Sequence, residues 1–134
     1  MTTLLELLRR ASAQTRWHNC SPEVILDEWN NLVSDCIDGY CFTIFEYRHD
    51  LEVRGVLELV IVEAENTPDP ELVDYVRRIR KADERFKSVL SVSVVERFRH
   101  QEWWYQRVPR YGDEDFASSA REAFGLNIQL YAFD

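Results

Sequence analysis

The sequence predicts a mainly α fold: a single-domain helical bundle over residues 1–134 to which a small β-element could be appended, with α+β as the alternative fold class. Three observations support this fold class. Two segments open with a cap residue followed by Pro-Glu, which is a typical helix start. Apolar residues recur at helical spacing along most of the chain. The chain has only 4 glycines and 4 prolines, fewer than a barrel or sandwich with many tight turns needs.

The first two predicted helices have clear apolar stripes. The first runs from Thr3 to about Gln14, with Leu4, Leu7, Leu8 and Ala11 on its stripe. The second runs from Pro22 to Asp38, with Ser21 as N-cap and Gly39 as the stop. Its apolar face consists of Ile25, Trp29, Leu32, Val33 and Cys36. Its polar face consists of Asp27, Glu28, Asn31, Asp35 and Asp38.

Residues 40–65 have two interpretations. Their β-branched and aromatic residues, with passable alternation over 51–62, indicate a hairpin. The helical interpretation takes Asp50 as N-cap and places Val53, Val56, Leu57, Val60, Ile61 and Ala64 on one stripe. We favour a helix from about 50 to 65, because both of its ends carry residues compatible with a helix terminus.

The remaining segments are predicted as follows. Asp69-Pro70-Glu71 starts a strong helix that runs to about Leu90. Its stripe is Leu72, Val73, Val76, Ile79, Ala82, Phe86 and Val89. Residues 91–98 have strand character but little beside them to pair with. A short helix is expected from Glu114 to Phe124, stopped by Gly125, and the apolar residues 126–133 could form a strand.

Composition excludes several classes of protein. With 46% hydrophobic and 30% charged residues, the chain has the composition of a soluble globular protein. Its longest apolar run, residues 57–62, contains Glu58 and is too short to span a membrane. The N-terminal segment has Glu6 in its apolar part and its arginines after that part, the reverse of a secretory signal. We therefore expect a cytoplasmic protein without a membrane partner, whose 3 cysteines remain thiols.

No motif predicts catalysis or a cofactor. The glycines are isolated, so no glycine-rich loop can hold a phosphate. Four potential zinc ligands occur, but their spacing matches no common zinc unit: His18, Cys20, Cys36 and Cys41. A cysteine nucleophile would need an adjacent base and an oxyanion loop, and the sequence offers no such loop. We expect a non-enzymatic protein without metal or cofactor.

Charge is unevenly distributed around the net value of −8. Residues 1–76 carry a net −10, residues 77–110 a net +6 and residues 111–134 a net −4. The acidic face of the second helix could attract a basic partner, or could be solvated surface: Asp27, Glu28, Asp35 and Asp38. Further candidates for partner binding lie in the arginine-rich and aromatic segment 97–115: Trp103, Trp104 and Tyr111. Because the two tryptophans are adjacent, we expect one in the core and the other against an arginine or a partner.

A set of short matches carries a resemblance to a class of small bacterial proteins. The matching residues are Gly39-Tyr40, Glu46-Tyr47, Asp50-Leu51-Glu52-Val53-Arg54, Ala82-Asp83-Glu84-Arg85-Phe86-Lys87, Trp103-Trp104 and Arg107-Val108-Pro109. This series resembles small acidic bacterial proteins, some of which are immunity proteins that neutralise secreted toxins, including those of contact-dependent inhibition systems. Such immunity proteins share no common motif, so the resemblance implies a class and assigns no residue.

Two functional hypotheses follow. The first is an immunity- or antitoxin-like inhibitor that binds and occludes a basic toxin, such as a nuclease, with its acidic surface. The alternative is a nucleic-acid-binding or regulatory module that uses the arginines and aromatics of residues 97–111. The net charge of −8 argues against the alternative, because binding to a phosphate backbone favours a basic domain. The sequence indicates neither the partner's identity nor the oligomeric state.

Overall fold

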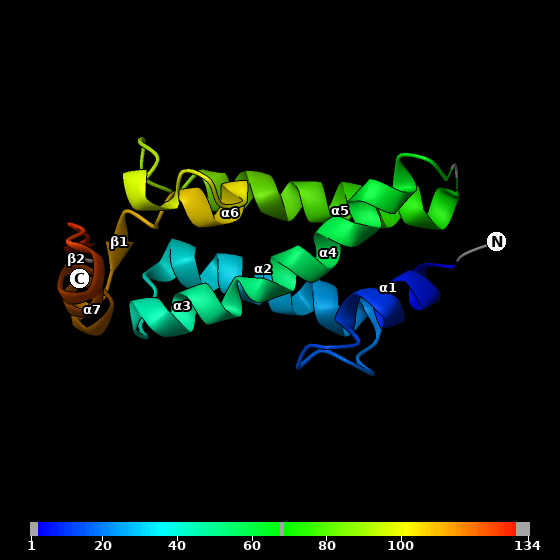
Figure 1. The fold of residues 1–134 in the computed structure, drawn as a ribbon, viewed down its shortest axis with the longest axis horizontal. Helices are drawn as coiled ribbons and strands as arrows, with labels where there is room; N and C mark the ends of the chain where they lie inside the picture. The colour runs from blue at the N-terminus through cyan, green and yellow to red at the C-terminus, as the bar shows by residue number, and fades with distance from the viewer. Residues whose placement is uncertain (1–2, 68, 131–134) are drawn as a thin grey trace. The chain divides into compact units, whose positions relative to one another are not determined.

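The computed structural model describes residues 3–67 and 69–130, which are mainly helical (Figure 1). The helices are α1 (Leu4–Ser12), α2 (Pro22–Asp38), α3 (Ile44–Asp50), α4 (Glu52–Ala64), α5 (Pro70–Lys87), the 3₁₀ turn η1 (Glu96–Phe98), α6 (Trp103–Gln106) and α7 (Glu114–Phe124). Two short strands, β1 (Tyr111–Gly112) and β2 (Gln129–Leu130), pair in parallel. The predicted fold class, mainly α with a small β-element, is confirmed.

The contacts of the chain group into two compact units. Unit 1 combines the residues up to Asn31 with Glu52–Glu84, and unit 2 combines Leu32–Leu51 with the residues from Arg85 onward. Helices α2 and α5 contribute to both units. The single domain expected from the chain length stays a prediction. Among the described residues, no helix has both the length and the apolar character needed to cross a membrane.

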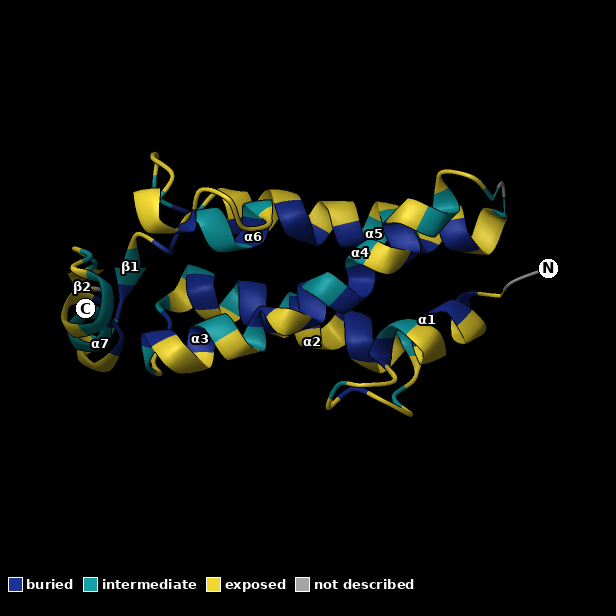
Figure 2. Ribbon diagram, in the orientation of Figure 1, coloured by how far each residue is buried: buried dark blue, intermediate teal, exposed yellow. Residues whose placement is uncertain are grey.

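Unit 1 is built from amphipathic helices whose starts are capped as the sequence predicts. The Ser21 hydroxyl accepts a hydrogen bond from the backbone N–H of Val24 (3.2 Å) at the start of α2. The Asp69 carboxylate accepts one from the N–H of Glu71 (2.8 Å) at the start of α5. Helix α1 lies beside α4, and Figure 2 shows buried and exposed residues alternating along these helices. The stripe of α4 is buried at Val53, Val56, Leu57, Val60 and Ile61.

The core of unit 1 contains a buried ion pair. Arg54 donates to both carboxylate oxygens of Asp83, from Nε and from a terminal nitrogen, each at 2.9 Å. The remaining terminal nitrogen of Arg54 donates to Glu58 at 2.8 Å, and the indole N–H of Trp29 donates to Asp83 at 3.1 Å. Arg54 and Asp83 are 0% and 1% exposed. Three hydrogen bonds to this carboxylate thus connect α2, α4 and α5.

Unit 2 is organised around three aromatic rings. Phe116 of α7 lies edge-on to Tyr40 and to Tyr47 of α3, with ring centroids 5.2 and 5.5 Å apart. Helices α3 and α7 are in contact, and the Ser119 hydroxyl accepts a hydrogen bond from the backbone N–H of Ile44 at 2.8 Å. A single β-bridge joins Tyr40 to Gly112, next to the pairing of β1 with β2. These contacts join segments of unit 2 that are far apart in sequence.

The structure corrects the interpretation of residues 40–65. Residues 44–64 form two helices, so the hairpin alternative is wrong, and the break falls at Leu51. Asp50 is the last residue of α3 rather than the N-cap of the next helix, and its carboxylate accepts a hydrogen bond from the Tyr40 hydroxyl (2.9 Å). The sequence carried a signal for α3 in Thr43 and Glu46, which have the spacing of a capping box, and the Thr43 hydroxyl accepts a hydrogen bond from the backbone N–H of Glu46.

Three smaller expectations also differ from the structure. Helix α5 ends at Lys87, before the predicted end near Leu90. Val73, predicted on the apolar stripe, is 58% exposed, whereas Tyr75, which was not predicted there, is buried. Residues 91–95 form no strand, although the N–H groups of Ser91 and Val95 donate to backbone carbonyls of residues 108 and 106. The expected terminal strand is present at 129–130, and residues 131–133 lie outside the described part. Gly39 and Gly125 have positive φ and end their helices as predicted.

Candidate functional site

The four candidate carboxylates of α2 all lie on the surface. Asp27 and Glu28 are exposed in unit 1, and Asp35 and Asp38 are exposed in unit 2. None of the four forms an ion pair with another residue of the described chain. Helix α2 also has no basic residue in its last turn. These carboxylates therefore present negative charge that no described cation of the chain neutralises directly.

Several other acidic residues are paired with the protein's own cations. Arg78 binds both carboxylate oxygens of Glu23, at 2.7 and 2.8 Å. That hydrogen-bonded contact lowers the pKa of Glu23 and raises that of Arg78. Glu96 pairs with Arg99 at 3.1 Å, and Asp74 pairs with Arg77. Acidic residues with a described ion pair, including Glu23 on α2 itself, therefore occur beside acids without one, and the four candidate carboxylates of α2 belong to the second group.

Asp35 is in an electrostatically unfavourable place. Partial burial raises its pKa above the ordinary value, and the neighbouring charges of Asp38 and Asp50 raise it further. The C-terminal end of a helix carries partial negative charge, which also disfavours carboxylates there. A neutral or basic residue at this position would avoid the repulsion and make the folded state more stable. A basic partner would relieve this repulsion.

We expect the variant Asp35→Asn to be at least as stable as the parent at pH 7. Because the pKa of Asp35 is higher in the folded state, stability from this group is lost as pH rises from the unfolded value of about 3.9 through the folded value. The gain from the variant should therefore vanish at lower pH. Melting temperatures measured from about pH 3, below the ordinary pKa of an aspartate, to about pH 8, well above it, test this directly. A variant clearly less stable than the parent at pH 7, with Asp27→Asn as the comparison, would contradict the assignment.

The two tryptophans are divided between the core and the surface, as their adjacency predicts. Trp104 is 3% exposed, whereas Trp103 is half-buried. Lys87 lies over the Trp103 ring, with its Nζ 4.8 Å from the ring centroid. Tyr111 is half-buried in β1, and the Arg110 guanidinium lies 5.5 Å from its ring. Trp103 and Tyr111 therefore remain accessible to a partner, and Trp104 is a core residue.

Most arginines of the segment 97–110 contact the protein itself. Arg97 donates to the carbonyl of Ala123 (3.3 Å), and Arg110 donates to the carbonyl of Ser88 (2.9 Å). Arg99 pairs with Glu96. The exception is Arg107, which is exposed and makes no hydrogen bond, ion pair or ring contact with a described residue. Its guanidinium is available for an anion.

An arginine from outside this segment packs among its aromatic rings. The Arg48 guanidinium of α3 lies 4.1 Å from the Phe98 ring centroid and 5.2 Å from that of Tyr105. It donates to Gln101 at 2.7 Å, and partial burial lowers its pKa. Sequence reasoning missed this contact, because no pattern links residue 48 to residues more than 50 positions away. Arg48 fixes the aromatic segment to α3.

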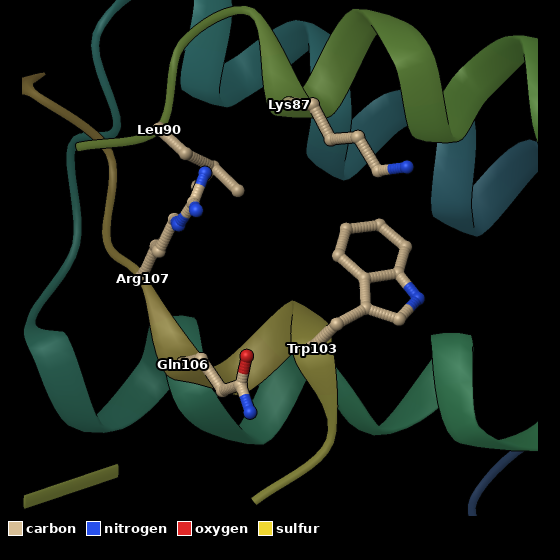
Figure 3. A pocket seen from close by; sticks show the side chains of 5 residues that line it. All are labelled: Lys87, Leu90, Trp103, Gln106 and Arg107. Atoms are coloured by element: carbon tan, nitrogen blue, oxygen red, sulfur yellow. The ribbon is translucent and has the colours of Figure 1, made fainter. Parts of the chain in front are cut away.

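A pocket of about 320 Å³ lies beside Trp103 in unit 2. Its lining residues are Lys87, Leu90, Trp103, Gln106 and Arg107, shown in Figure 3. The side-chain nitrogen of Gln106 donates to the carbonyls of Arg99 and Gln101, both at 3.0 Å. These two bonds fix the amide so that its oxygen points toward the pocket (Figure 3). Sequence reasoning did not identify Lys87 or Gln106 as site residues, since each occupies an ordinary polar helix position.

The four potential zinc ligands have different environments. His18 and Cys41 are exposed, Cys20 is partly exposed and Cys36 is buried on the apolar face of α2. Burial is the main reason why the pKa of Cys36 is raised, so it is present as a thiol. Within residues 3–67 and 69–130, no three histidine, cysteine or acidic side chains are grouped as metal ligands would be.

Comparison with protein-family models, with curated proteins and with solved structures finds no match to this chain.

Proposed function

We propose that this chain is a non-enzymatic protein that binds another protein: an immunity- or antitoxin-like inhibitor that occludes a basic bacterial toxin in the cytoplasm. The observation that carries the proposal is the set of exposed carboxylates on α2 that pair with no described cation, Asp27, Glu28, Asp35 and Asp38. Other exposed acids, such as Glu23 at the start of the same helix and Glu96, are paired with arginines.

The chemistry of a nuclease toxin fits such a surface. Nuclease active sites hold phosphates with cationic side chains, and exposed carboxylates offer the same charge and hydrogen-bond acceptors. A surface of unpaired acids raises the association rate with a basic protein through electrostatic attraction. The raised pKa of Asp35 supports this role, because a basic partner stabilises the charged form that the fold disfavours.

The second candidate, nucleic-acid binding by residues 97–111, has less support. Arg97, Arg99 and Arg110 are engaged with carbonyls or with Glu96, and Trp104 is buried. Base stacking by adjacent tryptophans would need both rings on the surface. The net charge of −8 also opposes contact with a phosphate backbone.

The experiment that tests the proposal reverses the two acidic pairs separately. We expect Asp27→Lys/Glu28→Lys, Asp35→Lys/Asp38→Lys or both to slow association with a basic toxin domain that the parent protein binds by about tenfold or more, because charge attraction sets the encounter rate. The variants should remain folded, since substitutions at exposed positions change stability by about half a kcal/mol each. Surface plasmon resonance at two salt concentrations and survival of toxin-expressing cells are the measurements.

The matched control carries the same change in net charge at other exposed acids, Glu65→Lys/Glu122→Lys. It should bind and protect like the parent. If both α2 variants are folded and protect as well as the parent, the acidic face is solvated surface and the proposed interface is wrong. The remaining accessible candidates are then Trp103 and Tyr111.

A further inference from the structure

We infer that the pocket beside Trp103 binds a small phosphate-bearing molecule with a flat heteroaromatic ring, of the class of nucleoside monophosphates. The inference is independent of the acidic residues of α2. It rests on the residues that line the pocket, Lys87, Leu90, Trp103, Gln106 and Arg107, all of which belong to unit 2.

The charge of the lining favours a dianion. Lys87 comes from the last turn of α5, and Arg107 follows α6, so two cations reach the pocket from separate elements. No acidic side chain is among the described residues that line it. A phosphate monoester carries a charge of about −1.5 to −2 at neutral pH. Two cations therefore complement the charge of a phosphate better than the single negative charge of a carboxylate. Arg107 has no described partner, so a ligand displaces no internal contact of this side chain.

The other lining groups favour a planar ring with a donor group. The Trp103 indole and Leu90 supply apolar contact area, and aromatic side chains bind bases by stacking. The Gln106 amide is held by the carbonyls of residues 99 and 101, which leaves its oxygen as a fixed acceptor toward the pocket (Figure 3). Such an acceptor fits the exocyclic amine of a base or a ribose hydroxyl. The volume of about 320 Å³ is at the small end of ligand pockets, which suits one nucleotide.

The test is titration of the full chain with adenosine 5′-monophosphate, in which binding is measured by calorimetry and by tryptophan fluorescence. We expect binding of one molecule with a dissociation constant below about 1 mM. Two fragments of this ligand should each bind at least about tenfold more weakly than the whole molecule, because each loses one set of contacts. They are adenosine, which lacks the phosphate, and inorganic phosphate, which lacks the ring.

Arg107→Gln is the decisive variant, because the parent side chain is exposed and makes no hydrogen bond, ion pair or ring contact with a residue in the described part of the chain. It should weaken binding by about tenfold or more through loss of a charge-assisted hydrogen bond. Arg99→Gln, in the same segment but outside the pocket lining, is the matched control and should bind like the parent. Absence of binding, or equal binding by Arg107→Gln and the parent, would overturn the inference. Tighter binding of an oligoadenylate than of the monophosphate would overturn it too, in favour of a nucleic-acid site.

Discussion

Asp83→Ala is expected to lower the free energy of unfolding by about 3–5 kcal/mol, because it leaves the buried Arg54 guanidinium without its anion. Both side chains are almost fully buried, and the pair is bidentate with 2.9 Å contacts. Glu58 compensates only in part, since it contacts one terminal nitrogen and is 33% exposed. The loss also strands the indole N–H of Trp29, which donates to the same carboxylate. Chemical denaturation with urea measures the change.

The matched control for this prediction lies on the same helix. Asp74→Ala breaks the exposed pair with Arg77 and should cost less than about 1 kcal/mol. The double variant Arg54→Met/Asp83→Leu replaces the buried charges by apolar groups and should recover most of the stability lost in Asp83→Ala. If the free energy of unfolding of Asp83→Ala lies within about 1 kcal/mol of that of the parent, loss of Asp83 does not leave Arg54 as an uncompensated buried charge, and the prediction is wrong.

Phe116→Ala is expected to cost about 3–5 kcal/mol in unit 2, because it removes a fully buried ring and leaves a cavity. The ring is 0% exposed and lies edge-on to Tyr40 and Tyr47, so neither neighbour can fill the space without losing its own contacts. Phe45→Ala on α3 is the matched control: that ring is 61% exposed, and its loss should change stability far less. Near-equal costs for the two variants would contradict the burial assigned to Phe116.

Gly112 provides an independent check of the same packing. A Cβ atom at this position would lie 2.4 Å from Cδ2 of Phe116, so Gly112→Ala should be destabilising by about 1–3 kcal/mol through overpacking. The Phe116→Ala background removes the ring atoms from this clash and leaves only the tight contact with Cβ of residue 116, so the same substitution should cost much less. The two substitutions are therefore expected to be non-additive. Additive costs would show that the two residues do not meet as described.

Local signals in the sequence were sufficient for α2 and α5. Ser21-Pro22-Glu23 and Asp69-Pro70-Glu71 mark their starts, and the caps form as these residues predict. Residues 40–65 were ambiguous because apolar residues also occupy the exposed face of α4, where Leu59 and Val62 are 55% and 50% exposed, and this weakens the periodicity that separates a helix from a strand. The short helix α3 was missed although its capping box was present in the sequence.

The candidate sites were predictable only in part. The exposure of the four α2 acids follows directly from helical periodicity, and the structure places all four on the surface. The pocket beside Trp103 depends on Lys87, which precedes it by 16 positions, and on a glutamine oriented by two backbone carbonyls. No local pattern encodes either. Arg54 offered a weak signal, since it is a cation between the apolar residues Val53 and Val56, but its partner Asp83 lies 29 positions further on.

Because the two units are interleaved along the chain, the ribosome completes unit 1 before it completes unit 2. All residues of unit 1 have been delivered once Glu84 is added, whereas residues 32–51 of unit 2 await the 50 residues from 85 to 134. At ribosomal rates of about 5–20 residues per second, that interval lasts about 3–10 s. For the first part of it, until residues 116 and 119 have been added, Tyr40, Tyr47 and Ile44 lack the Phe116 ring and the Ser119 hydroxyl that they contact in the finished protein. During synthesis we therefore expect residues 32–51 to expose apolar side chains that a chaperone could bind.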